Sequence, residues 1–181
     1  NNQKYIYVIM EQAKGVELKH YIEKNTLTLD EIVQIINQIL EAIKWMHKKN
    51  IIHTDLKPQN IFIDENKTIK VLDYGLSKII DFTSITSTGD TIGSPIYMSP
   101  EQVMDSKHID YRSDYYSLGV ILFELLSNRF PYNANNRNEL FYKILNEKPI
   151  SILQYVPEIP NYIDNLIISL LEKDVYKRPD S

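Results

Sequence analysis

The most informative segment of this 181-residue chain reads Ile52-His53-Thr54-Asp55-Leu56-Lys57-Pro58-Gln59-Asn60. It places a carboxylate, an ammonium group and an amide in one polar loop, and Asp73-Tyr74-Gly75 follows thirteen residues after Asn60. Asn60 and Asp73 offer oxygen ligands suited to a hard cation. Asp55 is a candidate base, and Lys57 is a point charge for phosphate. Phosphoryl transfer needs such a set, because its barrier falls mainly through positioning and charge neutralisation.

The segments on either side of this loop have clear local patterns. Thr28-Leu29-Asp30-Glu31 fits a capping box at a helix start. Apolar residues then recur at helical period, and Lys48, Lys49 and Asn50 close the helix. After the loop, residues 61–63 and 68–72 indicate two short strands joined by a polar turn. The loop is therefore expected between a long amphipathic helix and a small hairpin.

The rest of the chain indicates mainly helices. We expect a strand at residues 5–10 and helices at 17–24, 112–127, 139–147 and 162–172. Residues 73–101 show no sustained period and are expected to form a long loop, which in a compact domain is usually functional. The fold class is therefore α+β, with more helix than sheet. Trp45 and the isoleucine stripe are expected in the core, whereas three histidines are expected on the surface: His20, His47 and His108.

Composition excludes several classes of protein. Hydrophobic residues make up 43% and charged residues 24%, an ordinary globular balance. The net charge of −4 argues against a nucleic-acid partner, and the absence of cysteine excludes disulfides and Cys-ligated zinc. The longest apolar stretch, residues 118–126, contains a glutamate and is too short to cross a bilayer. We therefore expect a soluble, cytoplasmic protein without a membrane partner.

Five motifs, in order, resemble those of the eukaryotic protein kinase superfamily. HTDLKPQN (53–60) is similar to its catalytic loop H-R-D-x-K-x-x-N, and DYG (73–75) to its D-F-G. The sequence GSPIYMSPE (93–101) resembles the segment ending in A-P-E, SDYYSLG (113–119) the D-x-W-x-x-G helix, and KRP (177–179) the R-P near the end of the domain. The resemblance implies a protein-kinase-like fold with a mainly helical C-terminal lobe, short β-hairpins and one residual small-lobe strand.

The resemblance also implies catalytic roles and the cofactors ATP and Mg²⁺. Asp55 would accept or orient the proton of the substrate hydroxyl, and Lys57 would hold the γ-phosphate. Asn60 and Asp73 would hold Mg²⁺ against the ATP phosphates. The lysine two places after the base, together with Ser94, resembles the serine/threonine type, so the expected partner is a protein substrate with serine or threonine.

Around the adenosine of ATP, the resemblance assigns five more positions. Met10 would be the gatekeeper, and the backbones of Glu11 and Ala13 would meet the adenine edge. Phe62 would form the floor under the base, and Glu17 would face the ribose. Glu17, together with Glu124, also falls at a position that often meets basic residues upstream of the target serine.

Four residues outside the site have structural roles by resemblance. Glu101 and Arg178 would form a buried ion pair, and Asp114 would anchor the catalytic loop through its backbone. His53 is expected to be packed and hydrogen-bonded rather than a proton shuttle.

The sequence departs from the family pattern at several points. Thr54 replaces an arginine that, in the kinases that have it, binds a phosphate group on a loop by charge-assisted hydrogen bonds. Asp90 is expected to supply a weaker fixed charge in place of that phosphate. No glycine loop precedes residue 5, so we expect a fragment: residues 1–16 as the last small-lobe strand and hinge, and 17–181 as the large lobe with a truncated last helix. An isolated fragment of this kind is expected to be inactive. The alternatives are a pseudokinase-like scaffold and a small-molecule phosphotransferase.

Overall fold

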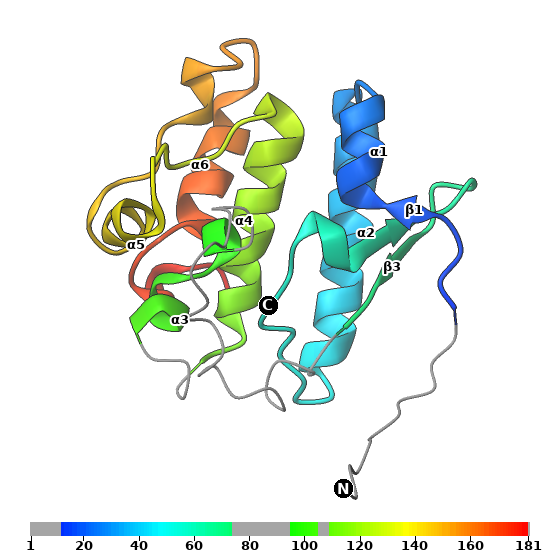
Figure 1. Cartoon of the computed structure of the whole chain (residues 1–181), viewed down its shortest axis with the longest axis horizontal. Helices are drawn as coiled ribbons and strands as arrows, with labels where there is room; N and C mark the ends of the chain where they lie inside the picture. The colour runs from blue at the N-terminus through cyan, green and yellow to red at the C-terminus, as the bar shows by residue number, and fades with distance from the viewer. Residues whose placement is uncertain (1–11, 74–94, 105–108, 181) are drawn as a thin grey trace, which may run out of the picture.

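The structure, a computed structural model, describes residues 12–73, 95–104 and 109–180. Figure 1 shows α1, α2 and the sheet on one side and α3 to α6 on the other. This arrangement confirms the mainly helical α+β architecture, while the strand expected at residues 5–10 lies outside the described residues. The helices and strands are β1 (Val16–Glu17), α1 (Leu18–Lys24), α2 (Leu29–His47), β2 (Ile61–Ile63), β3 (Ile69–Val71), α3 (Pro100–Met104), α4 (Arg112–Ser127), α5 (Arg137–Asn146) and α6 (Asn161–Leu170).

Helix α2 begins as its sequence predicts. Thr28 Oγ1 accepts from the Glu31 backbone N–H at 3.3 Å, and Glu31 Oε2 accepts from the Thr28 N–H at 3.0 Å, which completes the capping box. The apolar stripe is buried as expected at Ile32, Ile35, Ile39, Ile43 and Met46. The expectation for Trp45 is wrong, because it is 59% exposed. Trp45 lies two residues after Ile43, and a step of two turns a side chain to the other side of a helix.

A small antiparallel sheet joins the N-terminal end of the described chain to the hairpin that follows the loop. Its strand order is β1-β2-β3, with Val16 opposite Ile63 and Glu17 opposite Phe62. Gly15 makes this pairing feasible: it has φ +104°, and a Cβ there would lie 2.2 Å from the Ile63 carbonyl oxygen. Strand β1 was not expected, because two residues are too few to show a period.

Helix α4 lies between α6 and α2 and contacts both of them (Figure 1). Its residues from Ser113 to Glu124 are all buried, which explains why its sequence shows no polar face. Its bounds match the predicted helix at 112–127, and α5 and α6 differ from prediction by one or two residues at each end. Helix α3 begins inside the predicted loop 73–101, so that boundary is wrong. None of the described helices is long and apolar enough to cross a membrane.

Candidate active site

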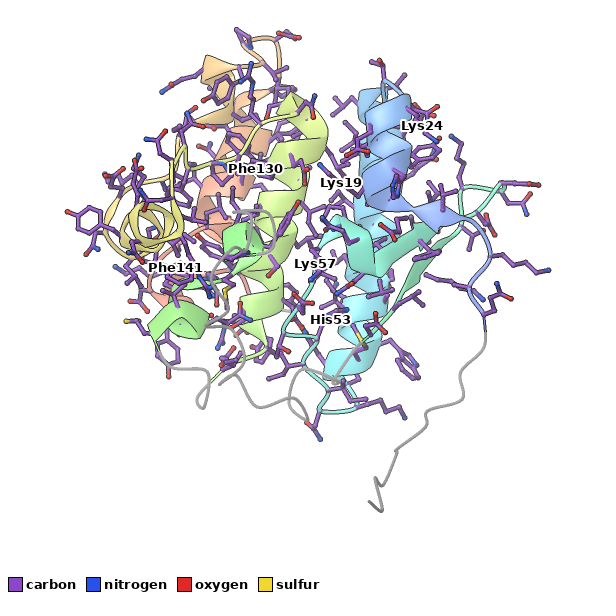
Figure 2. All side chains as sticks on the ribbon, in the orientation of Figure 1. Lys19, Lys24, His53, Lys57, Phe130 and Phe141 are labelled. Atoms are coloured by element: carbon purple, nitrogen blue, oxygen red, sulfur yellow. The ribbon has the colours of Figure 1, made fainter. Side chains whose placement is uncertain are left out.

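Hydrogen bonds join three polar side chains of the loop after α2. Lys57 Nζ lies 2.8 Å from Asp55 Oδ2, and Asn60 Nδ2 donates to the same oxygen at 3.0 Å. Leu56 between them is buried. The Asp55 side chain remains 44% exposed. The loop therefore presents a carboxylate to solvent in a direction fixed by an ammonium and an amide group, and Figure 2 shows Lys57 between α1–α2 and α4.

His53 connects this loop to the strand that leads to Asp73. Its ring is fully buried: Nδ1 accepts from the Asp55 N–H at 3.3 Å, and Nε2 donates to the Leu72 carbonyl oxygen at 2.9 Å. The Leu72 N–H in turn donates to the Asn60 carbonyl oxygen at 2.8 Å. Leu72 is thus bonded to both ends of the loop, and Asp73 follows it directly. The prediction of a packed, hydrogen-bonded His53 is confirmed.

The backbone on both sides of this connection is strained. Thr54 has φ +67° and Asp73 has φ +60°, both in the left-handed region. Aspartate adopts this region more readily than most residues, whereas a β-branched residue such as threonine rarely does. Such conformations cost on the order of 1–3 kcal/mol and persist only where the surroundings hold them. At Thr54 the buried Asp114 does so, accepting from the N–H groups of His53 at 2.9 Å and Thr54 at 3.0 Å. The predicted anchoring role of Asp114 is confirmed.

His47 is a residue that sequence reasoning assigned wrongly. Its side chain is only 10% exposed, and its Nε2 lies 2.7 Å from Asp114 Oδ2, the oxygen that also accepts from His53. The rings of Tyr111 and Tyr115 pack against it. No local pattern could have revealed this contact, because its partner lies 67 residues away.

The described residues among those predicted to meet adenosine, namely Ala13, Glu17 and Phe62, lie around β1 and β2. Glu17 and Phe62 are directly opposite each other in the antiparallel pair, so their side chains share one face of the sheet. Glu17 Oε2 lies 3.4 Å from His20 Nδ1, and His20 is on the surface as expected. Ala13 lies just before β1 and is half-buried. Met10 and Glu11 lie outside the described residues.

The predicted ion pair between Glu101 and Arg178 is confirmed. Arg178 Nη1 and Nη2 reach the two carboxylate oxygens at 2.6 and 2.7 Å, and Ser113 Oγ donates to Glu101 Oε1 at 2.5 Å. Burial acts to raise the pKa of the Glu101 carboxyl, but the hydrogen bonds and charge of Arg178, helped by Ser113, outweigh it and hold the pKa below its usual value. The pair joins the start of α3 to the end of the described chain.

The expectation that Glu124 meets a basic substrate residue is wrong. Glu124 is 3% exposed, and both of its carboxylate oxygens are bonded within the chain. Lys19 Nζ lies 3.1 Å from Oε1, and the Tyr97 hydroxyl donates to Oε2 at 2.7 Å. Burial, followed by the charge of Glu124, raises the pKa of the Tyr97 hydroxyl far above its usual range. Lys19, which sequence reasoning missed, thus supplies the cation for this carboxylate.

Two residues, Asn60 and Asp73, are the predicted oxygen ligands for a cation. Among the residues that the structure describes, no three His, Cys, Asp or Glu side chains gather closely enough to hold a metal ion. Asn60 uses its amide nitrogen on Asp55, so its side-chain carbonyl oxygen is the atom suited to a cation. The Leu72 N–H donates to the Asn60 backbone carbonyl oxygen, and Asp73 follows Leu72 directly. Mg²⁺ is commonly held by one or two protein oxygens together with phosphates and water. The donor set therefore fits Mg²⁺ shared with phosphate.

Several predictions cannot be placed in this site. The aromatic residue after Asp73, the proposed fixed charge and the serine near the base all fall outside the described residues: Tyr74, Asp90 and Ser94. The same holds for His108.

Comparisons with known proteins agree with this geometry. The whole chain, residues 1–181, matches the family model described as "Protein kinase domain". It is 39% identical to the probable serine/threonine-protein kinase PknB of Lactococcus lactis and 37% identical to the serine/threonine-protein kinase PrkC of Bacillus subtilis, each over 95% of this chain. It is also 37% identical to the serine/threonine-protein kinase ULK3 of Xenopus laevis over 98% of this chain. The chain spans 27%, 26% and 38% of the lengths of these three relatives.

Proposed function

We propose that this chain, which belongs to the protein kinase family, carries the catalytic large lobe of an enzyme that transfers the γ-phosphate of ATP to serine or threonine hydroxyls of proteins. The observation that carries the proposal is the bonded set of Asp55, Lys57 and Asn60, connected through Leu72 to Asp73. The family as a whole uses ATP and Mg²⁺. The relatives named above support a serine or threonine hydroxyl as the acceptor.

In the proposed reaction, Asp55 receives the proton of the substrate hydroxyl. The hydroxyl oxygen forms a bond to the γ-phosphorus while the bond from that phosphorus to the β–γ bridging oxygen breaks, which releases ADP. Lys57 holds the γ-phosphate as it moves, and its contact with Asp55 keeps base and phosphate in one place. Asn60 and Asp73 would hold Mg²⁺, which neutralises phosphate charge when bound.

The nucleotide would lie against the face of the sheet that carries Glu17 and Phe62. This face supports the proposal because one strand offers a carboxylate for ribose hydroxyls and the next an aromatic ring for the base. Ala13, together with Met10 and Glu11, would line the adenine edge. In this arrangement residues 1–16 end the small lobe and residues 17–181 form the large lobe.

Two substitutions in the full-length protein test the proposal. Asp55→Asn and Asp73→Asn should each lower the rate of phosphate transfer from ATP-Mg²⁺ by roughly 10²–10⁴-fold, because each removes a charge from the reacting centre. Asp64→Asn is the matched control. Asp64 Oδ1 accepts from the N–H groups of Asn66 and Thr68 in the turn between β2 and β3, and an asparagine oxygen can take its place.

The nature of the product separates the alternatives. Phosphoserine or phosphothreonine, lost in both site variants but not in the control, supports the proposal. A wild-type protein that binds ATP or a partner but transfers no phosphate would indicate a scaffold. Phosphorylation of a small molecule without protein phosphorylation would indicate the other phosphotransferase class.

A further inference from the structure

We propose that Gln102 is a positioning residue for the catalytic loop, which it holds through the carbonyl group of Thr54. The inference rests on the proposed function, since it concerns the residue directly before the base Asp55. Gln102 lies in α3, 48 residues after Thr54, and is 6% exposed. None of the five kinase-like motifs includes it.

The amide of Gln102 contacts two separate segments at once. Nε2 donates to the Thr54 carbonyl oxygen at 2.6 Å, and Oε1 accepts from the Ser99 N–H at 2.9 Å. Ser99 Oγ accepts in turn from the Gln102 N–H at 3.4 Å, so the same side chain also caps the start of α3. A donor on one end and an acceptor on the other fix the direction of the amide.

The contact matters because Thr54 is strained. A β-branched residue at φ +67° keeps that conformation only where neighbours hold it. Asp114 holds its N–H side, and Gln102 holds its carbonyl side. That carbonyl belongs to the peptide group whose nitrogen is Asp55 N, which donates to His53. A shift of this peptide would therefore move the carboxylate away from the place where it meets a hydroxyl.

The same bonds connect the base to the Ser99-Pro100-Glu101 segment. Glu101 is held by Arg178, and Ser99 is held by Gln102, so α3 starts from a fixed position. Through its hydrogen bond to the Thr54 carbonyl oxygen, the side chain of Gln102 connects the start of α3 directly to the loop. The segment that resembles the one ending in A-P-E and the loop that carries the proposed base are thereby kept in register.

Gln102→Glu in the full-length protein tests this inference. It keeps the size and the acceptor for Ser99, but at pH 8 it places a carboxylate oxygen against the Thr54 carbonyl oxygen. We expect kcat to fall about 10- to 100-fold, the scale for a misplaced catalytic group, with little change in KM for ATP. Burial raises the pKa of such a carboxyl, and its protonated form can donate to Thr54. The kcat ratio of variant to wild type should therefore rise several-fold between pH 8 and pH 6.

Gln38→Glu is a matched control. Gln38 Nε2 donates to the carbonyl oxygen of Lys67 at 2.9 Å, and Lys67 also has positive φ, but this contact lies in the turn of the hairpin. Gln38→Glu should keep the kcat and pH profile of the wild type. If Gln102→Glu does not fold, Gln102→Met removes the donor without a charge, and it should lower kcat with no recovery at low pH.

The failures can be told apart. A folded Gln102→Glu or Gln102→Met variant with wild-type kcat and pH profile overturns the positioning role. A wild-type protein without ATP-dependent protein phosphorylation overturns the proposed function instead.

Discussion

The proposed catalytic loop and the contact between α4 and α6 are held by different forces. The loop at residues 51–60 has little regular structure, and single polar side chains from distant helices hold its backbone, notably Asp114 and Gln102. The α4–α6 contact is apolar and so close that a Cβ on Gly119 would lie 2.9 Å from the Cβ of Leu170. A change in the loop should therefore lower activity more than stability, and a change at the helix contact should do the reverse.

The largest effect should come from the ion pair of Glu101 and Arg178 on the helical side. A large loss of stability on removing it would show that apolar packing is not the only force that holds this side. Arg178→Met leaves the buried carboxylate of Glu101 without its cation. We expect a loss of about 4 kcal/mol in the free energy of unfolding, the usual scale for removing one partner of a buried ion pair. Urea denaturation followed by circular dichroism measures it.

The control for this prediction is Arg129→Met. Arg129 is exposed just after α4, so its replacement should change the free energy of unfolding by less than about 0.5 kcal/mol. Equal stability of the Arg178 and Arg129 variants would show that the pair contributes nothing.

Asp114→Asn should have the next largest effect, and it tests the loop side of the comparison. One carboxylate oxygen becomes an amide nitrogen that cannot accept from the backbone of His53 or Thr54. We expect kcat to fall about 100-fold, equivalent to about 2.7 kcal/mol in the barrier, because the base shifts. Steady-state phosphorylation assays on the full-length protein measure it.

Asp164→Asn is its counterpart on the helical side. Asp164 Oδ1 accepts from Ser151 Oγ at 2.9 Å and from the Ile152 N–H at 3.0 Å. The substitution should leave kcat within a factor of two or so, since these contacts join residues 151–164 and involve no residue of the loop. A similar loss of kcat in both variants would remove the distinction between the two regions.

The same distinction explains what the sequence could predict. Helix α4 at 112–127 and the capping box at Thr28 follow from local patterns, because period and capping involve residues within a few positions. The motif residues Asp55, Asn60 and Asp73 were predicted from their spacing. Two non-local contacts were predicted by resemblance, Glu101 with Arg178 and Asp114 with the loop backbone, but partners outside the family's motifs were not.

Three side chains contact partners far along the chain, namely His47, Gln102 and Lys19, over 67, 48 and 105 residues. No short window of sequence contains these pairs. The prediction for Trp45 was wrong for a related reason. Its apolar character suggested the core, but its place on α2 directs the side chain to solvent.

Gly119→Ala should have a smaller effect, confined to stability. Alanine favours a helix over glycine by up to about 1 kcal/mol, but a new Cβ against Leu170 and Leu171 forces α4 and α6 apart, at about 1–3 kcal/mol. We expect a net loss of about 1 kcal/mol in the free energy of unfolding, with kcat unchanged. A variant more stable than the wild type would show that the contact can relax.

The smallest expected effect concerns Lys173, which follows α6 in the chain and contacts backbone carbonyl groups near the C-terminal end of α5. Its ammonium group donates to the Ile144 carbonyl oxygen, and it lies over the ring of Tyr132. Burial, followed by the charge of Arg178, lowers the pKa of Lys173 to about 8. The unfolded chain keeps this lysine protonated up to about pH 10.4.

Between pH 8 and about pH 10 the unfolded state therefore binds more protons than the folded state, and this group makes stability rise with pH. Lys173→Met should remove that rise, which urea denaturation at pH 7.5 and 9.5 measures as a difference between variant and wild type. Partial exposure screens the effect and keeps it small. Lys177→Met, at an exposed lysine four residues later, should follow the wild-type profile. If the Lys173 variant also follows the wild-type profile, Lys173 is solvated like a surface lysine. The helical side then depends on apolar packing at this position.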